Sequence, residues 1–224
     1  MTDPVFFCAS LGADEILLDG PEGRHAALVK RLRVGEWLDL VDGRGTRASC
    51  VVASTTRDAL VATVRSRVVD PEPSPRITVV QALIKGDRGE LAVELMTEVG
   101  VDAIVPWQAS RCIAKWNDKV GQRWRSSAFE AAKQARRSWF PTVGEPGPVP
   151  AGTVLVLHEE ASVPLSSVAV ESDVTLVVGP EGGISPEELE ALGGTAVRLG
   201  PTVLRASTAG AAAAAVVSAK LGRW

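Results

Sequence analysis

The pattern of apolar and polar positions changes once along the chain. Through the first 70 residues, apolar and polar residues alternate in short runs with a period of two, which is typical of strands with one buried face. The predicted strands are 15–18, 37–41, 48–52 and 60–64. Asp42-Gly43-Arg44-Gly45 lies between two of them and predicts a hairpin turn.

One short helix interrupts these strands. His25, Leu28, Val29 and Leu32 fall on one face of a predicted helix over residues 23–32. Several short strands with a single helix are typical of a small β-barrel. Residues 1–70 are therefore predicted to form such a barrel.

A proline-rich segment follows. Pro71, Pro73 and Pro75 stand at alternate positions, which favours an extended and stiff backbone. We therefore predict a linker over residues 71–75 and a second domain over residues 76–224.

Strands and helices alternate in the second domain. The predicted strands are 77–84, 103–107, 153–157, 174–178 and 196–199, and the predicted helices include 90–99 and 207–221. This order is typical of an α/β domain with a mostly parallel sheet.

The most informative stretch is the end of the strand 174–178. It stops at Gly179-Pro180-Glu181-Gly182-Gly183, and Ser185, Pro186 and Glu188 then provide an N-cap, a first-turn proline and a capping box. A glycine turn exposes backbone N–H groups at the carboxyl end of a strand, where open α/β sheets bind ligands. A strand-to-helix turn that binds no ligand could have the same sequence. A second turn, Leu199-Gly200-Pro201, however, again follows an apolar strand. Two such turns favour a ligand site.

Composition narrows the class of protein. The chain has 224 residues, a formal net charge of -3 and no apolar run long enough to span a membrane. Residues 1–13 lack the basic start of a secretory signal. The three cysteines and two histidines are too scattered for a zinc site or a disulfide framework. We expect a cytoplasmic protein with reduced thiols, without a metal and without a membrane anchor.

Basic residues concentrate in two places. One is the barrel segment that contains Arg31 and Arg33, and the other is the segment 111–137, which has eight Lys or Arg against two acidic residues. Such clusters either follow the phosphates of a nucleic acid or form a solvated face, and both readings stay open. Helical spacing puts Trp116 and Trp124 near one face, which favours a core role for these rings.

Two further features admit two readings each. His158-Glu159-Glu160 follows a predicted strand and is either an acid/base group or a surface loop, and we favour the loop. The last helix is dominated by Ala and Gly, so it packs closely against either the turn loops or a second subunit.

Several familiar catalytic motifs are missing from the sequence. No Gly-x-Gly-x-x-Gly fingerprint follows the first strand of the second domain, and neither a Gly-Lys-Ser/Thr phosphate loop nor a Gly-x-Ser-x-Gly elbow is present. Few groups suit covalent catalysis, which favours a reaction whose reactive group comes with a cofactor.

The motifs together resemble a known family. The loop 179–183, Leu199-Gly200-Pro201, Leu204-Arg205 and Thr208-Ala209 are similar to those of the 16S ribosomal RNA (uracil-N3)-methyltransferase family (RsmE type) of the SPOUT class. Weaker similarities extend over nearly the whole chain, at His25, Leu32-Arg33, Gly35, Asp42-Gly43, Thr97-Glu98, Gly100-Val101, Arg111, Ala131, Gln134, Arg137 and Pro141.

The resemblance implies a fold, a cofactor and a partner. Family members have an N-terminal PUA-like β-barrel, bind S-adenosylmethionine in a deep trefoil knot of the C-terminal domain, and act as homodimers. The matching cofactor positions are Leu157, Gly179, Pro180, Glu181, Gly182, Leu199, Gly200, Leu204, Thr208 and Ala209. The implied reaction is methylation of N3 of one uridine in the decoding region of 16S rRNA, within the assembled small subunit.

A mechanism follows from the substrate. The proton on uracil N3 must leave, and a cation near O2 or O4 stabilises the developing anion. We expect Arg205 to be this catalytic cation; the alternative is a structural salt bridge. The residues expected to bind RNA are Arg31, Arg33, Arg111, Lys115, Arg136 and Arg137.

The sequence also departs from the family pattern. Ser207, Lys133 and Leu95 stand where the family usually or often has Glu, Glu and Lys. Without the glutamate at 207, the general base is left open. Two alternatives also remain: a related methyltransferase that acts on another RNA position, and a non-catalytic RNA-binding or ribosome-assembly protein on the same scaffold.

Overall fold

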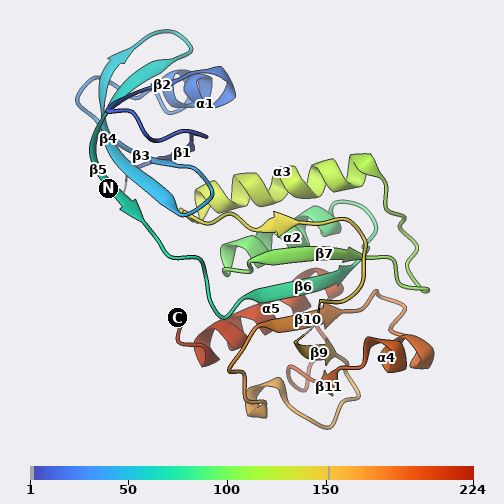
Figure 1. The fold of residues 1–224 in the computed structure, drawn as a ribbon. Helices are drawn as coiled ribbons and strands as arrows, with labels where there is room; N and C mark the ends of the chain where they lie inside the picture. Colours follow the sequence, from blue (N-terminus) through green and yellow to red (C-terminus); the bar gives the residue numbers. More distant parts are fainter. Residues whose placement is uncertain (1–2, 151) are drawn as a thin grey trace. The chain divides into compact units, whose positions relative to one another are not determined.

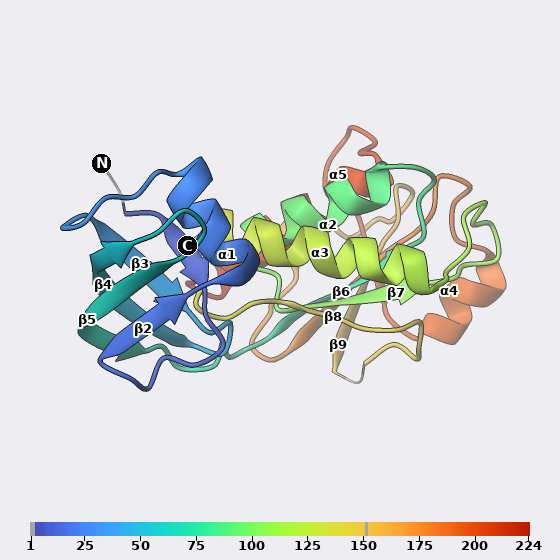
Figure 2. The same ribbon diagram turned by 90° about the horizontal axis from the view of Figure 1, so that it is seen from above.

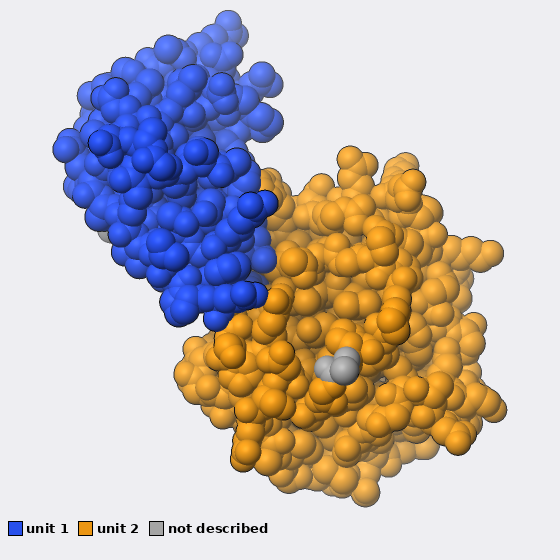
Figure 3. Space-filling view, viewed as in Figure 1, with its two compact units in different colours: residues 1–72, 133–140 blue, residues 73–132, 141–224 orange. Residues whose placement is uncertain are grey.

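The computed structural model describes residues 3–150 and 152–224 and divides the chain into two compact units. The first unit comprises residues 1–72 and 133–140, and the second comprises residues 73–132 and 141–224 (Figure 3). Residues 133–140 were predicted to belong to the second domain, whereas they group with the first unit. No helix within the described ranges combines the length and the apolarity needed to cross a membrane.

The first unit is a curled, mixed five-stranded sheet. Its strands are β1 (Val5–Phe7), β2 (Glu15–Leu18), β3 (Trp37–Val41), β4 (Thr46–Thr55) and β5 (Leu60–Val69), in the order β1-β3-β4-β5-β2. β1 runs parallel to β3, and the other pairs are antiparallel. Alternate side chains such as Leu38 and Leu40 enter the core. The predicted hairpin turn is confirmed: Asp42 Oδ1 accepts from the N–H groups of Arg44 and Thr46 at 2.8 and 2.9 Å.

The helix of the first unit differs from the prediction. α1 (Gly20–Arg24) continues into a π-helical turn, η1 (His25–Val29), in which Lys30 N donates to His25 O at 2.9 Å. The predicted apolar face is wrong, because Val29 is 67% exposed while Ala26 is fully buried. A π turn holds more residues than an α turn, so it rotates the last side chains away from the face that a period of 3.6 predicts.

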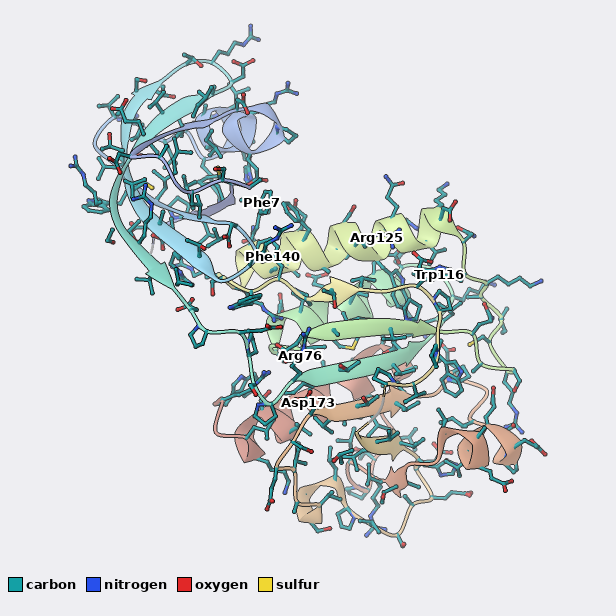
Figure 4. All side chains as sticks on the ribbon, in the orientation of Figure 1. Phe7, Arg76, Trp116, Arg125, Phe140 and Asp173 are labelled. Atoms are coloured by element: carbon teal, nitrogen blue, oxygen red, sulfur yellow. The ribbon has the colours of Figure 1, made fainter. Side chains whose placement is uncertain are left out.

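Residues 133–140 belong to the first unit through specific contacts. The Trp139 indole N–H donates to Asp70 O at 3.0 Å, and the Phe140 ring lies 6.0 Å from the ring of Phe7 (Figure 4). Gly45 has φ +99° and lies under Trp139, where a Cβ atom would come within 2.6 Å of the indole nitrogen. These contacts make the segment part of the first core.

The second unit is built on a six-stranded sheet in the order β11-β9-β10-β6-β7-β8, with every pair parallel (Figure 1). The strands are β6 (Ile77–Ala82), β7 (Ala103–Trp107), β8 (Thr142–Val143), β9 (Thr153–Leu157), β10 (Val174–Val178) and β11 (Thr195–Val197). In a parallel sheet the carboxyl ends of all strands meet at one edge. The predicted parallel α/β architecture is therefore confirmed.

Helices cover both faces of this sheet. α2 (Arg88–Glu98), α3 (Asp118–Gln134) and α5 (Ala206–Lys220) pack on one face (Figure 2), and the short α4 (Pro186–Leu192) packs on the other; η2 (Leu165–Ser167) is a single 3-10 turn. Leu176 enters the core under the three helices, whereas its neighbour Val177 packs toward α4.

The small residues of α5 allow a close approach. A Cβ atom on Gly210 would lie 2.9 Å from Sδ of Met96 in α2 and 3.4 Å from Val178 in β10. The last helix was predicted to pack against the turn loops or a second subunit. Its close contacts are instead with α2 and the sheet, and the second subunit stays a prediction.

Candidate functional site

A cavity of about 740 Å³ opens at the carboxyl ends of β9, β10 and β11. These three strands are adjacent in the sheet, so the loops that follow them converge. The loops and the strand ends before them contribute residues 157–160, 178–184 and 197–205 to the walls, and α5 contributes Ala206, Ser207 and Ala209. The whole site lies within the second unit. Its position matches the general location of ligand sites in open α/β sheets.

The loop after β10 is shaped by close backbone packing. A Cβ atom on Gly179 would lie 2.6 Å from Cγ1 of Ile184, and Gly183 has φ +76°. Arg111 Nη1 donates to the carbonyl of Gly182 at 3.0 Å. The glycines therefore let the loop fold tightly, and the hydrogen bond from Arg111 stabilises it.

The predicted capping box anchors this loop to α4. Ser185 Oγ accepts from Glu188 N at 3.2 Å, and Glu188 Oε2 accepts from Ser185 N at 3.0 Å. Glu188 Oε1 also accepts from Ser110 N at 2.6 Å. Partial burial raises the pKa of Glu188, but the hydrogen bonds from Ser110 and Ser185 outweigh it, so this pKa lies below its usual value. Glu188 thus ties together the loops that carry Gly182 and Arg111.

The loop after β11 leads into α5. Arg205 is the N-cap of α5, its side chain is exposed, and it lines the cavity. Among the described residues, its guanidinium makes no ion pair or hydrogen bond, so the alternative role in a structural salt bridge has no partner there. Ser207 lies buried in the cavity wall two residues later. The first turn of a helix carries a partial positive charge, which adds to that of Arg205.

The structure gathers most of the predicted cofactor residues. Nine of the ten line the cavity, namely Leu157, Gly179, Pro180, Glu181, Gly182, Leu199, Gly200, Leu204 and Ala209. Thr208 is not a lining residue; its Oγ1 donates to the carbonyl of Arg205 at 3.1 Å. It therefore stabilises the start of α5.

Other lining residues were missed or read differently from sequence. His158, Glu159 and Glu160 do form a loop, as favoured, but this loop is part of the cavity wall. Arg88 and Arg198 also line the cavity, and Arg198 Nη1 donates to Ala161 O at 3.2 Å. Arg88 stands four residues after the end of the predicted strand 77–84, and this position was the available signal. Within the described ranges, no three His, Cys, Asp or Glu side chains form a metal-binding group.

The six predicted RNA-binding residues divide between the units. Arg31, Arg33, Arg136 and Arg137 belong to the first unit, and Arg111 and Lys115 belong to the second. Arg31 and Arg33 are exposed, whereas Arg137 is half-buried and donates through Nε to Trp139 O at 2.9 Å. Their role in RNA binding stays a prediction.

The tryptophans at the start of α3 form part of a rigid corner. Trp116 precedes the helix rather than lying on it, yet its ring meets that of buried Trp124 edge-on at 5.5 Å. Glu145 accepts from Trp116 Nε1 at 2.6 Å and from Arg125 Nη1 at 3.0 Å (Figure 4). These contacts fix the loop 108–117.

Comparisons with known proteins agree with this geometry. Residues 71–218 match the family model for an RNA methyltransferase domain, and residues 18–65 match the model for an RNA methyltransferase PUA domain. The chain is 47% identical to ribosomal RNA small subunit methyltransferase E of Mycobacterium tuberculosis, over 93% of this chain and 87% of the relative.

Solved structures extend the comparison. Ribosomal RNA small subunit methyltransferase E from Neisseria gonorrhoeae, bound to S-adenosyl methionine, superposes with a TM-score of 0.87 at 27% identity, over 97% of this chain and 98% of that one. The SpoU methyltransferase AviRb from Streptomyces viridochromogenes shares the fold, with a TM-score of 0.50 at 12% identity over 94% and 92% of the chains. The chain belongs to the ribosomal RNA small subunit methyltransferase E family.

Proposed function

We propose that this protein transfers a methyl group from S-adenosylmethionine to N3 of one uridine in the decoding region of 16S rRNA. The observation that carries the proposal is the cavity of about 740 Å³ formed by the loops after β9, β10 and β11, with the cation of Arg205 in its wall. The relatives named above support the reaction class. The deep trefoil knot implied by the resemblance stays a prediction.

The cavity fits the cofactor in size and in chemistry. Its volume lies within the range of roughly 300–1,000 Å³ that is usual for small-molecule sites. Tight glycine turns leave backbone groups for the polar parts of the cofactor, and Leu157, Leu199 and Leu204 supply apolar wall. The nine lining residues named above would hold it, together with the turn stabilised by Thr208. When bound, its sulfonium supplies the methyl group.

Methyl transfer requires that the N3 proton be accepted and that the negative charge on the uracil be stabilised. Arg205, assisted by the first turn of α5, stabilises the negative charge that develops on uracil O2 or O4 as the N3 proton leaves. Ser207 cannot serve as a carboxylate base, but Glu159, Glu160 and Glu181 line the same cavity. A carboxylate is therefore available to accept the proton, directly or through water.

The substrate is proposed to be 16S rRNA within the assembled small subunit. Cations on both units, at Arg31, Arg33, Arg136 and Arg137 and at Arg111 and Lys115, suit scattered contacts to phosphates. We further propose that two copies associate through the second unit, as in the family. The half-buried Ala212 and Ala215 and the exposed Leu91 offer small and apolar surface for this contact. A ribosomal substrate would also place the enzyme in the cytoplasm.

Mass spectrometry of small-subunit RNA tests the proposal. Purified protein and S-adenosylmethionine are incubated with ribosomal subunits that lack the modification, and the RNA is digested and sequenced. We expect one N3-methyluridine in the decoding region. A methyl group on another nucleotide would support the proposed reaction class and show that the target nucleotide is a different one. RNA binding and cofactor binding without transfer would instead support the non-catalytic alternative. Light scattering of the purified protein tests the dimer.

A further inference from the structure

A second, smaller cavity of about 100 Å³ lies in the second unit. It is formed by the loop after β6, the first turn of α2, and the segment that leads into α3. Its lining consists of Leu83, Ile84, Lys85, Gly86, Glu90, Ala114, Lys115, Val120, Arg123 and Trp124. It shares no lining residue with the large cavity. Its volume is that of roughly three water molecules, so it accepts the edge of a planar ring rather than a whole nucleotide.

The distinctive group in this cavity is the Glu90 carboxylate. Both of its oxygens are buried, and neither accepts a hydrogen bond within the described parts of the chain. Arg123 Nε lies 3.0 Å from Oε1, which makes an ion pair without the alignment of a hydrogen bond, and half of the Arg123 side chain is exposed. A buried carboxylate that lacks donors is costly. The arrangement therefore favours a ligand that brings N–H groups.

The rest of the cavity is apolar inside and cationic outside. Leu83, Val120 and the ring of Trp124 form the walls, and the Trp124 ring is held rigidly because a Cβ atom on Gly89 would lie 2.9 Å from its Nε1. Lys85 and Lys115 are exposed and have no ion pair among the described residues. Apolar walls suit a nucleobase, and cations at the rim suit its phosphate.

We propose that this cavity is a subsite for the guanine base of a nucleotide next to the target uridine, with Glu90 as the residue that reads it. Guanine presents N1–H and N2–H side by side, which matches the two oxygens of the Glu90 carboxylate, neither of which accepts a hydrogen bond within the described residues. Uracil presents a single N3–H between two carbonyl oxygens that a carboxylate repels. Adenine and cytosine each present one amino group beside an acceptor nitrogen. The proposal rests on the function proposed above.

The placement of the two cavities supports a neighbouring nucleotide. The same two loops line both of them. Arg88 faces the large cavity while Lys85 and Glu90 line the small one, and Arg111 faces the large cavity while Lys115 lines the small one. A strand of RNA with one base in the large cavity therefore passes the rim of the small cavity, and the cations between them suit the connecting phosphates.

Nucleotide binding tests the subsite without any methylation assay. GMP and IMP, which differ only in the N2 amino group, are titrated into the whole protein and followed by ligand-observed NMR. We expect GMP to bind about tenfold more tightly than IMP. This preference should disappear in Glu90→Gln and persist in Glu98→Gln, an exposed control on the same helix. Equal binding of GMP and IMP by the unaltered protein would overturn the proposal, and that comparison needs no variant to fold.

Methylation kinetics then show whether the small cavity binds a base within the RNA substrate or a free nucleotide. Each nucleotide within two positions of the methylated uridine is replaced in turn, with inosine wherever guanosine stands. We expect one guanosine whose replacement lowers kcat/KM about tenfold in the unaltered enzyme and not in Glu90→Gln. If GMP binding depends on Glu90 but no replacement matters, the site takes a free nucleotide and the RNA subsite is wrong. If the unaltered enzyme methylates nothing while GMP binds as expected, the proposed function fails and the guanine site stands.

Discussion

Lys133 and Glu22, which are 111 residues apart in the chain, form an ion pair of 2.6 Å inside the first unit. The Lys133 side chain is 3% exposed and that of Glu22 is 15% exposed. The second oxygen of Glu22 accepts from Phe7 N at 2.9 Å. Both charged groups of the pair are therefore largely removed from solvent.

Removal of one member of this pair should destabilise the first unit. Glu22→Gln removes the negative charge beside a buried ammonium, and we expect it to lower the free energy of unfolding by about 3 kcal/mol, measured by urea denaturation. The double variant Glu22→Leu with Lys133→Met removes both charges and should recover much of the loss. A cost below about 1 kcal/mol for the single change would show that the pair is not structurally important.

Arg205 should act on turnover rather than on cofactor binding. Arg205→Ala removes the cation that stabilises the developing uracil anion, and we expect kcat to fall by about 100-fold to 1,000-fold. The affinity for S-adenosylmethionine, measured by calorimetry, should change only a few-fold. Arg205→Lys keeps a charge and should retain part of the activity. Equal losses of kcat and of cofactor affinity would remove Arg205 from the catalytic role.

Two glycines of the large cavity should respond differently to an added methyl group. A Cβ atom on Gly179 would lie 2.6 Å from Ile184, so Gly179→Ala should lower both the unfolding midpoint and, by roughly tenfold, the affinity for S-adenosylmethionine. A Cβ atom on Gly200 meets nothing within 4 Å. Gly200→Ala should therefore keep the midpoint and weaken binding only through contact with the cofactor. Unchanged binding in both variants would place the cofactor elsewhere.

Glu188 should make stability depend on pH in acid. Its pKa is lowered in the folded state by the N–H groups of Ser110 and Ser185, against the usual value of 4.5. A carboxyl with a lowered pKa stabilises the fold above its unfolded pKa and loses this effect as the pH falls through the folded pKa. The difference in unfolding free energy between the unaltered protein and Glu188→Gln should thus be constant near pH 7 and shrink below about pH 4.5. A difference that persists unchanged to pH 3 would contradict this assignment.

Cys50 should be the least reactive thiol of the first unit. Its side chain is fully buried, and burial, with the nearby Asp39 carboxylate, raises its pKa to about 11. At pH 8 the thiolate is therefore scarce and shielded, and we expect iodoacetamide to modify Cys50 only after unfolding. Peptide mass spectrometry measures this, with the partly exposed Cys8 as the internal comparison. Modification of Cys50 at the same rate as Cys8 in the folded protein would contradict the burial.

Strand positions were predictable where turn residues bound the apolar run. β2, β3, β7, β9 and β10 begin and end at the predicted residues. β4 and β5 extend past their predicted ends, at 52 and 64, because their backbones stay paired beyond the buried face. Thr55 and Ser66 are paired in the sheet, yet their side chains are polar and exposed, so they carry no hydrophobic signal.

Other features depend on contacts that a sequence pattern does not contain. The π turn at His25–Val29 changes the side-chain direction without changing the composition. The loops that build the large cavity were recognisable from Gly179 and Gly200, because a tight turn needs particular residues. Glu90 carried no such mark, since the burial of its oxygens arises only when the chain folds and places Val120 and Trp124 in the same cavity.

The chain crosses between its two units after residues 72, 132 and 140. The first unit therefore cannot be separated from the second by dividing the chain at the proline-rich segment, because residues 133–140 also belong to it. Removal of residues 1–72 would expose Trp139 and Phe140, which have their partners among those residues. During synthesis, residues 73–132 leave the ribosome before residues 133–140, which complete the first unit. The first unit therefore cannot be complete before most of α3 has been made, and the two units cannot fold strictly one after the other.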